Sequence, residues 1–407
     1  MRPNEPPTST WPVVAASMGA WARLAGAEVV VDAVLGTGAV GALRPEVRAA
    51  ILAMNQAGRP ILSLDLPSGL DGDTGAVRDE AVRADTTMTF SARKVGLYLG
   101  EGPEYAGRVW FDDLQATPPE TGRDPLVLER ELPVLERLDE RDILRALPRR
   151  ARTTHKGDFG RVLIIAGGPG MGGAARLAGE ACLRSGAGLV TVATAPENVA
   201  VILAGRPELI CCAVRRAEDL EVPLATASVV AVGPGLGTGA WSRELFAVAM
   251  QSGKRLVLDA DALNLLASTG EPPPPGTVLT PHPGEAGRLL GSSAAAVQSD
   301  RLAALQKLIE RNGAVVALKG AGTLIGAPGR VPALCTRGNP GMAAPGMGDV
   351  LTGAIAGILA QCGDPWLAAR AAVMAHALAG DDLARLGGGR GMLALEVAEG
   401  LARWVNG

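Results

Sequence analysis

The sequence predicts an α/β protein built on parallel sheets that helices cover on both faces. Short runs of Val, Ile and Leu recur along the 407 residues without polar alternation, as in strands buried on both sides. Segments rich in Ala, Leu, Arg and Glu with helical character separate most of these runs. The 54 glycines and 29 prolines concentrate where the apolar runs end, which is typical of turns after buried strands.

Eight apolar runs are the predicted strands, and four segments are the predicted helices. The strands are 29–31, 61–64, 162–165, 189–193, 229–232, 256–258, 278–279 and 315–318; the helices are 174–184, 301–311, 354–360 and 367–385. The stretch 115–124 is polar and contains two prolines, which favours a linker. We therefore expect one unit at 1–120 and a second at 121–407.

Composition excludes several classes of function. A net charge of −3 gives no basic field for a nucleic acid, and 3% aromatic residues leave too few side chains for base stacking. The five cysteines form no CxxC pair or zinc spacing, which indicates a reduced interior. The first residues lack the apolar core of a signal peptide, and no apolar run reaches about 18 residues. We expect a soluble cytoplasmic homo-oligomer that binds neither membranes nor nucleic acids.

Four polar or glycine-rich elements follow strands between residues 167 and 285 of the second unit. The loops 167–174 (GGPGMGGA) and 233–239 (GPGLGTG) are either anion-binding loops at helix N-termini or plain tight turns. Asp259 and Asp261 follow a strand, where they can reach a ligand or hydrated Mg²⁺, or where Asp261 caps the next helix. His282 lies between two prolines in 280–285 (TPHPGE), and we favour a ligand contact for it.

Two further elements indicate phosphoryl transfer. Lys319 is one of only five lysines and opens the glycine turn 319–323 (KGAGT), which favours phosphate contact over a surface turn. Gly346 and Gly348 precede a helix, where their amides can form a pocket for a phosphoryl group. Asp349 follows them and can accept a hydroxyl proton; a simple cap would not require the two glycines. The chain has no GxxxxGK[ST] motif, so a nucleotide-dependent enzyme other than a P-loop protein is predicted.

The motif Gly346-Met347-Gly348-Asp349 resembles the G-x-G-D loop of the ribokinase-like superfamily. More closely, His155-Lys156-Gly157 and the six elements together resemble the ADP-dependent NAD(P)H-hydrate dehydratases over about residues 130–407. This resemblance implies a three-layer α/β/α domain. It also implies that ADP, with Mg²⁺, phosphorylates the ring hydroxyl of the damaged cofactor (S)-NAD(P)HX, after which phosphate is eliminated and NAD(P)H is restored.

The same resemblance implies a role for individual residues. Asp349 would activate the hydroxyl, while Gly346 and Gly348 would hold the transferring phosphate. One departure is Ala344-Pro345, where the family usually has Thr-Gly, because a proline removes one backbone donor. The nucleotide site would be lined by Lys319, Gly320, Ala321, Gly322 and Thr323, and the hydrate would contact Ala174, Gly235, Gly237, His282 and Asp349.

The first unit resembles the C-terminal half of the Rossmann-like NAD(P)HX epimerase domain. The resemblance lies in 29–38, 62–70, 84–90 and 94–97. It implies that Asp32 and Ser68 bind K⁺ and that Asp65 acts on the hydrate, although capping explains both carboxylates equally well. Gly36, Thr37 and Gly38 would lie near the phosphates of the hydrate.

Two questions remain open at the level of the sequence. The family's N-terminal half, with its Asn-Asn-Gly-Gly-Asp-Gly motif, has no match here, so we expect an open sheet face and edge and weak or absent epimerase activity. A ribokinase-like kinase of a vitamin-precursor alcohol is the alternative enzyme, and it would leave a stable phosphate ester. A nucleotide sensor without turnover is the non-enzymatic alternative.

Overall fold

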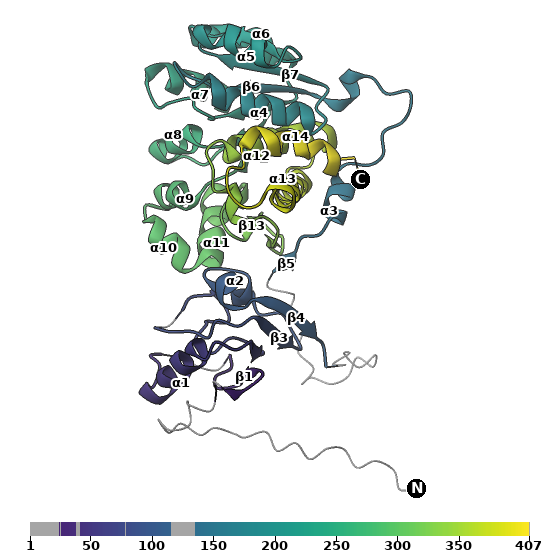
Figure 1. Cartoon of the computed structure of the whole chain (residues 1–407). Helices are drawn as coiled ribbons and strands as arrows, with labels where there is room; N and C mark the ends of the chain where they lie inside the picture. Colours follow the sequence, from purple (N-terminus) through teal and green to yellow (C-terminus); the bar gives the residue numbers. More distant parts are fainter. Residues whose placement is uncertain (1–23, 25, 38–40, 78, 115–134, 407) are drawn as a thin grey trace, which may run out of the picture. The chain divides into compact units, whose positions relative to one another are not determined.

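The computed structural model describes residues 24, 26–37, 41–77, 79–114 and 135–406. They belong to two compact units, Met1–Val127 and Leu128–Gly407, which are treated separately below (Figure 1). The predicted boundary at residues 120 and 121 lies outside the described residues. Within the described ranges, no helix combines the length and the apolar character that a membrane span requires.

The first unit holds a parallel four-stranded sheet in the order β1-β2-β3-β4. One face packs on α1, where Val30, Ile51 and Ile61 share a small core. On the opposite face, Val31 and Trp110 are 45% and 49% exposed. The elements are β1 (Val30–Asp32), α1 (Pro45–Gln56), β2 (Ile61–Leu64), β3 (Thr86–Phe90), η2 (Val95–Leu97), α2 (Gly102–Tyr105) and β4 (Arg108–Asp112).

The second unit is built on a ten-stranded sheet in the order β5-β14-β13-β12-β11-β10-β9-β6-β7-β8. All six strands predicted in this unit are present, with ends that differ by at most one residue. The sheet is formed by β5 (Glu136–Arg137), β6 (Arg161–Ile165), β7 (Leu189–Thr194), β8 (Ile210–Ala213), β9 (Val229–Val232), β10 (Arg255–Leu258), β11 (Val278–Leu279), β12 (Val315–Leu318), β13 (Thr323–Gly326) and β14 (Ala333–Cys335).

The prediction of a wholly parallel sheet is wrong at one end. Strand β13 runs antiparallel to both β12 and β14. Only residues 319–322 separate β12 from β13, and so short a connection allows a hairpin but not the crossover that a parallel neighbour needs. This hairpin places the turn that begins at Lys319 at the end of a buried strand.

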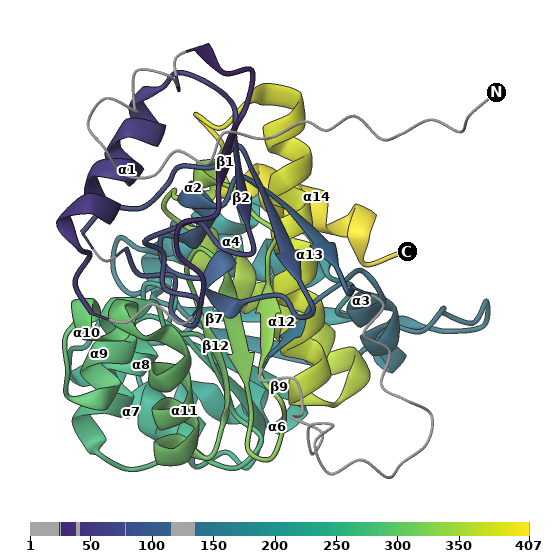
Figure 2. The same ribbon diagram turned by 90° about the horizontal axis from the view of Figure 1, so that it is seen from below.

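Helices cover both faces of this sheet, which gives the expected three layers. Figure 2 shows α7–α11 on one side of the strands and α12 and α13 on the other, and α4 packs against α12. The helices are α3 (Arg141–Ala146), α4 (Gly172–Arg184), α5 (Val199–Gly205), α6 (Glu221–Thr226), α7 (Ala240–Met250), α8 (Asp261–Thr269), α9 (Pro283–Leu290), α10 (Ala294–Ser299), α11 (Arg301–Asn312), α12 (Met347–Cys362), α13 (Pro365–Gly387) and α14 (Ala394–Trp404). Short 3₁₀ turns lie at η3 (Lys156–Phe159), η4 (Pro196–Asn198), η5 (Ala217–Leu220) and η6 (Pro340–Met342).

Close contact between α12 and α4 fixes where α12 begins. A Cβ on Gly353 would lie 2.0 Å from the carbonyl oxygen of Ala178 in α4, so only glycine allows the two helices to approach this closely. Helix α12 is buried over most of its length, with Val350 and Ile355 fully enclosed. The glycine-rich loop before α12 is therefore held near the carboxyl ends of the strands.

Candidate active site

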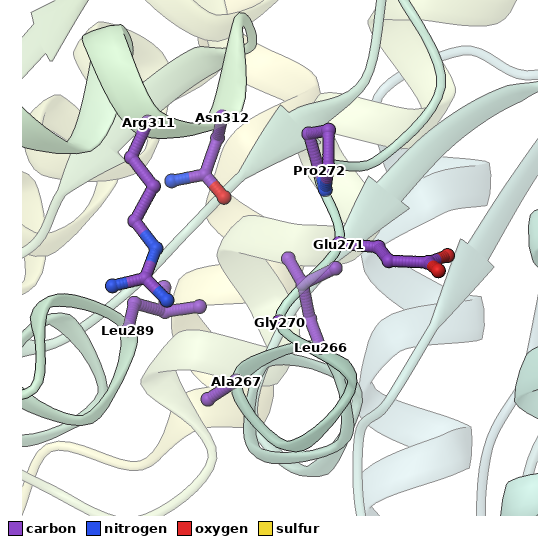
Figure 3. A pocket seen from close by; sticks show the side chains of 8 residues that line it. All are labelled: Leu266, Ala267, Gly270, Glu271, Pro272, Leu289, Arg311 and Asn312. Atoms are coloured by element: carbon purple, nitrogen blue, oxygen red, sulfur yellow. The ribbon is translucent and has the colours of Figure 1, made fainter.

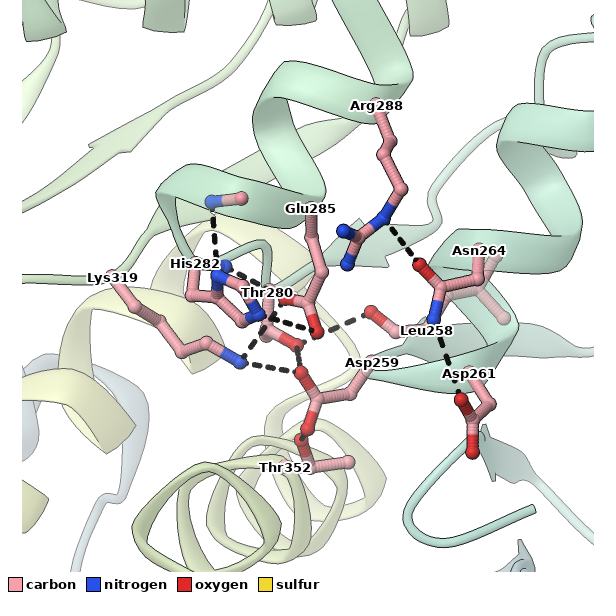
Figure 4. A network of polar contacts seen from close by, with 11 residues as sticks. Leu258, Asp259, Asp261, Asn264, Thr280, His282, Glu285, Arg288, Lys319 and Thr352 are labelled. Atoms are coloured by element: carbon pink, nitrogen blue, oxygen red, sulfur yellow. Dashed lines mark hydrogen bonds and ion pairs between the residues drawn. The ribbon is translucent and has the colours of Figure 1, made fainter. Parts of the chain in front are cut away.

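Three polar side chains meet where β10, β11 and β12 end. Asp259, Thr280 and Lys319 each follow one of these neighbouring parallel strands (Figure 4). Asp259 Oδ1 accepts hydrogen bonds from Lys319 Nζ at 2.6 Å and from Thr280 Oγ1 at 2.8 Å. The Asp259 side chain is 1% exposed, so this ion pair lies in the protein interior. Polar groups are thereby concentrated at the edge where open α/β sheets bind ligands.

Helix α12 is bonded to this cluster through Thr352. Thr352 Oγ1 donates to Asp259 Oδ2 at 2.8 Å, one helical turn after the glycine-rich loop. The Cβ position of Gly348 lies 3.3 Å from Lys319 Nζ and 3.6 Å from Asp259 Oδ2. The structure thus brings together the predicted phosphate-contacting lysine and the predicted phosphoryl-transfer loop, which are separated by about 30 residues in the sequence.

Asp349 lies in the first turn of α12 and has a raised pKa. Burial, followed by the nearby charge of Asp259, raises the pKa of Asp349 to about 7, while Lys319 opposes the shift. A base is most effective when its pKa lies near the working pH. Among the described residues, no side chain caps α12, and its N-cap is Gly346 in the left-handed region at φ 86°. The capping alternative for Asp349 is therefore not supported.

Lys319 is shared between two carboxylates. Its ammonium lies 3.7 Å from Glu285 Oε2 in addition to its bond with Asp259. Burial lowers the pKa of Lys319, but Asp259 and Glu285 outweigh this effect, and the pKa is raised. Burial raises the pKa of Glu285, with Lys319 opposing. Lys319 is consequently a fixed cation at neutral pH.

His282 begins α9 and has two partners within the chain. Its Nδ1 accepts from the Gly284 amide at 2.9 Å, and its Nε2 lies 3.3 Å from Glu285 Oε1. Glu285 Oε2 in turn accepts from the His282 amide at 2.7 Å, which completes a capping box. The His282 side chain remains 51% exposed, so the predicted ligand contact is compatible with this capping role.

The two glycine loops lie side by side. The amides of Gly167 and Gly168 donate to the carbonyls of Pro234 and Gly235 at 2.9 and 2.7 Å. The Cβ position of Gly235 is 3.1 Å from the Cβ of Ala174, so two of the predicted hydrate contacts are neighbours.

Asp261 joins these loops to the strand edge. Its Oδ2 accepts from the Gly237 amide at 2.7 Å, and its Oδ1 accepts from Asn264 Nδ2 at 3.3 Å. The N-cap of α8 is Ala260, and no side chain caps this helix among the described residues. The alternative that Asp261 caps the helix is wrong.

In the first unit, Asp32 is completely buried and saturated with donors. Oδ2 accepts from Ser63 Oγ and the Ser68 amide, both at 2.8 Å, and Oδ1 accepts from Ser68 Oγ at 2.6 Å. Ser68 Oγ also lies 3.4 Å from the Leu35 carbonyl oxygen. Gly36 and Thr37 are exposed just beyond, whereas Gly38 is outside the described residues.

Asp65 has a different environment at the end of β2. It adopts a left-handed backbone with φ 68° and forms an ion pair with Lys94. Its Oδ1 also accepts from the Phe90 amide at 3.2 Å. The two side chains are 28% and 19% exposed, so a ligand can reach them. Within the described residues, no group of three or more His, Cys, Asp or Glu side chains is arranged to hold a metal ion.

Comparison with known proteins identifies the family. Residues 162–403 match the model for NAD(P)H-hydrate dehydratase, and residues 7–96 match that for the YjeF-related protein N-terminus. The bifunctional NAD(P)H-hydrate repair enzyme of Coxiella burnetii is 45% identical over 93% of this chain and 76% of its own length. The Escherichia coli enzyme is 42% identical over 93% of this chain and 72% of its own. This chain belongs to the bifunctional NAD(P)H-hydrate repair enzyme family.

Solved structures agree with the fold of the dehydratase unit. The ADP/ATP-dependent NAD(P)H-hydrate dehydratase of Bacillus subtilis, co-crystallised with ATP and Mg²⁺, is 30% identical with a TM-score of 0.60. The match covers 66% of this chain and 97% of that protein. A ribokinase-like superfamily protein from Enterococcus faecalis is 32% identical with a TM-score of 0.62, over 67% of this chain and 96% of its own. The predicted ribokinase-like fold is confirmed.

Several side chains in the cluster around Asp259 and Lys319 were given no role in the sequence analysis. Thr280 and Glu285 lie inside the quoted motif 280–285, and Thr352 follows Asp349 by three residues, but a threonine or a glutamate at these places gives no separate signal. For Thr280 and Glu285, the position in a strand-end motif is the sequence feature that could have marked them. A shallow pocket between α8, α9 and α11 is separate from the cluster (Figure 3); it is lined by Leu266, Ala267, Gly270, Glu271, Pro272, Leu289, Arg311 and Asn312.

Proposed function

We propose that the second unit converts (S)-NAD(P)HX to NAD(P)H with ADP as the phosphoryl donor. The observation that carries this proposal is the position of Asp349, a carboxylate with a pKa of about 7 at the start of α12, beside the fixed cation Lys319. Phosphoryl transfer needs positioning and charge stabilisation more than covalent chemistry. A base, a cation and helix N-terminal amides supply these requirements.

The reaction would proceed in two steps. Asp349 takes the proton from the ring hydroxyl, whose oxygen bonds to the terminal phosphorus of ADP as the bond to the AMP oxygen breaks. Lys319 and the Gly348 amide stabilise the charge on the phosphoryl oxygens. In the second step, the carbon–oxygen bond breaks, inorganic phosphate leaves, and the neighbouring ring carbon loses a proton. Phosphate leaves far more easily than hydroxide, which explains the use of a nucleotide.

The remaining residues would bind the two substrates. We assign Lys319, Gly320, Ala321, Gly322 and Thr323, with Gly346 and Gly348, to the nucleotide, and Ala174, Gly235, Gly237 and His282 to the hydrate. Mg²⁺ would be held mainly by the nucleotide phosphates. Asp259 does not fit as its ligand, because both of its oxygens already accept hydrogen bonds from Lys319, Thr280 and Thr352.

Substitution of Asp349 by asparagine tests this assignment. We expect Asp349→Asn to lower turnover by about 10²–10⁴-fold, the usual contribution of a general base, while ADP affinity changes little. Recovery of reduced nicotinamide absorbance and release of inorganic phosphate measure the reaction. Asp158→Asn, an exposed aspartate outside the cluster, is the control. A phosphate ester that accumulates without NAD(P)H would favour the kinase alternative, and an unchanged rate in Asp349→Asn would refute the role of the base.

We further propose that the first unit acts on the same hydrate as an epimerase. Asp65 and Lys94 would contact the ring, and Gly36, Thr37 and Gly38 would lie near the phosphates. Asp32 and Ser68 are the proposed K⁺ ligands, with the Leu35 carbonyl beside them, and the cation would have to replace the hydrogen bond that Ser68 Oγ donates to Asp32 Oδ1. Interconversion of the R and S hydrates, with K⁺ replaced by Na⁺ as a control, tests this site. Weak epimerase activity, a cytoplasmic location and a homo-oligomeric state stay predictions.

A further inference from the structure

A buried arginine lies beneath the turn that joins β12 to β13. Arg301 is the first residue of α11 and is 5% exposed. Its Nη2 is shared among three main-chain oxygens, those of Leu318 at 3.2 Å, Lys319 at 3.4 Å and Gly322 at 3.0 Å. The planar guanidinium therefore holds both ends of a turn that consists of only a few residues.

No carboxylate neutralises this guanidinium among the described residues. Its Nη1 donates to Gln298 Oε1 at 3.3 Å, and its Nε is buried without a hydrogen-bond partner among the described residues. Burial lowers the pKa of Arg301 to about 10, so the group is still a cation at neutral pH. Burying an unpaired charge is costly, and an apolar residue of similar size would stabilise a fold at least as well. A structural role alone therefore explains Arg301 poorly.

The contact of Arg301 with the Lys319 carbonyl determines which way the Gly320 amide points. Every peptide bond in the described ranges is trans, so the N–H of each peptide points opposite to its carbonyl. Because the Lys319 carbonyl faces Arg301, the Gly320 amide points away from it. No acceptor within the described part of the chain takes a bond from the amides of Gly320, Ala321 or Gly322.

Gly320 makes this arrangement possible. Its backbone has φ 147°, and a Cβ at this position would lie 2.2 Å from Arg301 Nη1. Any other residue would both strain the backbone and displace the guanidinium. Arg301 and Gly320 therefore act together: Arg301 binds the carbonyls of the turn, and Gly320 leaves room for the guanidinium.

We propose that Arg301 is a positioning residue for the nucleotide diphosphate. It would hold the carbonyls of Leu318, Lys319 and Gly322 inward, so that the Gly320 amide points outward and can donate to a phosphate oxygen. Its unpaired charge would add to the positive potential that attracts the polyanion. The inference rests on the proposed dehydratase function, because it names the ligand of the same site. Arg301 should therefore affect the affinity for the nucleotide and leave the affinity for the hydrate unchanged.

Steady-state kinetics of Arg301→Met, in the full chain, test this proposal. We expect the KM for ADP, and its Kd by calorimetry without hydrate, to rise about tenfold or more. The KM for the hydrate and kcat at saturating ADP should stay within about threefold. Arg301→Lys keeps the charge but loses the planar fork, so an intermediate rise is expected. Arg311→Met, an exposed arginine on the same helix, is the matched control and should leave both constants unchanged.

A purely structural arginine would give a different pattern. Both Arg301 variants would then lose thermal stability and kcat while the KM for ADP stayed at the wild-type value, and this outcome overturns the proposal. If Arg301→Met does not fold, Arg301→Lys alone gives the same comparison, because it keeps the charge and removes the planar fork. A wild-type protein that neither binds ADP nor restores NAD(P)H contradicts the proposed function itself, whereas active wild type with unaltered nucleotide constants in the variants contradicts only the role of Arg301.

Discussion

Each unit places a lysine–aspartate ion pair at the carboxyl end of parallel strands, but the two pairs differ in burial. Asp259 is 1% exposed and Lys319 18% exposed in the dehydratase unit. Asp65 is 28% exposed and Lys94 19% exposed in the first unit. Helices cover both faces of the larger sheet, whereas Val31 and Trp110 on one face of the small sheet are 45% and 49% exposed.

This difference changes what the aspartate can do. Asp259 is 1% exposed and receives three donors within the chain, Lys319, Thr280 and Thr352, so it anchors the helix that carries Asp349. Asp65 stays accessible to a ligand. A strand-end aspartate paired with lysine is therefore not by itself the reacting group: burial and the number of donors decide whether it supports the chemistry or takes part in it.

Removal of Lys319 should produce the largest effect. Lys319→Met leaves the buried Asp259 without its cation, and breaking a buried pair in this way costs about 3–5 kcal/mol. Urea unfolding measures the change, and turnover should fall with it. Lys307→Met, exposed on α11, is the control and should change stability by about 0.5 kcal/mol or less. A loss below about 1 kcal/mol in Lys319→Met would mean that the pair is not desolvated.

The pH dependence of activity should report Asp349. Because its pKa is raised to about 7, kcat/KM should fall up to tenfold for each pH unit below 7, as the base becomes protonated. In Asp349→Asn the residual rate should lose this dependence.

The stability of the fold should also depend on the ionisation of Asp349, but it should fall with rising pH where activity rises. Between the ordinary pKa of an aspartate, about 4, and a pKa of about 7, the native state binds more protons at Asp349 than the unfolded state does. Its contribution to stability is therefore present below about pH 4 and is lost as the pH rises through 7. Thermal unfolding above pH 7 should show Asp349→Asn melting higher than wild type, and equal melting temperatures there would argue against the raised pKa.

The smallest effect is expected for the pair in the first unit. Lys94→Met should cost about 1 kcal/mol or less, because Asp65 is partly hydrated and keeps its bond from the Phe90 amide. Unfolding of the full chain, monitored by a probe in the first unit, provides the measurement. A cost as large as that of Lys319→Met would remove the contrast drawn above.

Most of the fold could be predicted because buried parallel strands have a simple pattern. The runs at 229–232 and 315–318 are continuous and apolar, the first followed by Gly233 and the second by Lys319-Gly320, and both are strands with those limits. β8 escaped prediction because Ile210–Ala213 is an edge strand with partly exposed cysteines. β13 and β14 are short segments of a hairpin, and β5 has only two charged residues, so no pattern indicates them.

The parts of the site that lie in glycine-rich loops could be predicted from the sequence, and the other side chains could not. Glycines around Lys319 and Asp349 have a steric reason that a sequence reveals, since few other residues fit there. Arg301 opens a helix with charged residues, a pattern that indicates a solvated face, and only the fold shows that it turns inward. Thr352 likewise resembles any helical threonine until the register of α12 places it against Asp259.

The two-residue strand β5 matters for anyone who wishes to produce the dehydratase unit separately. Glu136 and Arg137 pair with β14 and so close one border of the ten-stranded sheet. Arg370 of α13 donates hydrogen bonds to Glu136 and Asp142 and so holds this segment in place. A recombinant fragment that starts after Arg137 would expose the main-chain donors and acceptors of β14. Another molecule could then add a strand at this edge, so the fragment should start upstream of Glu136.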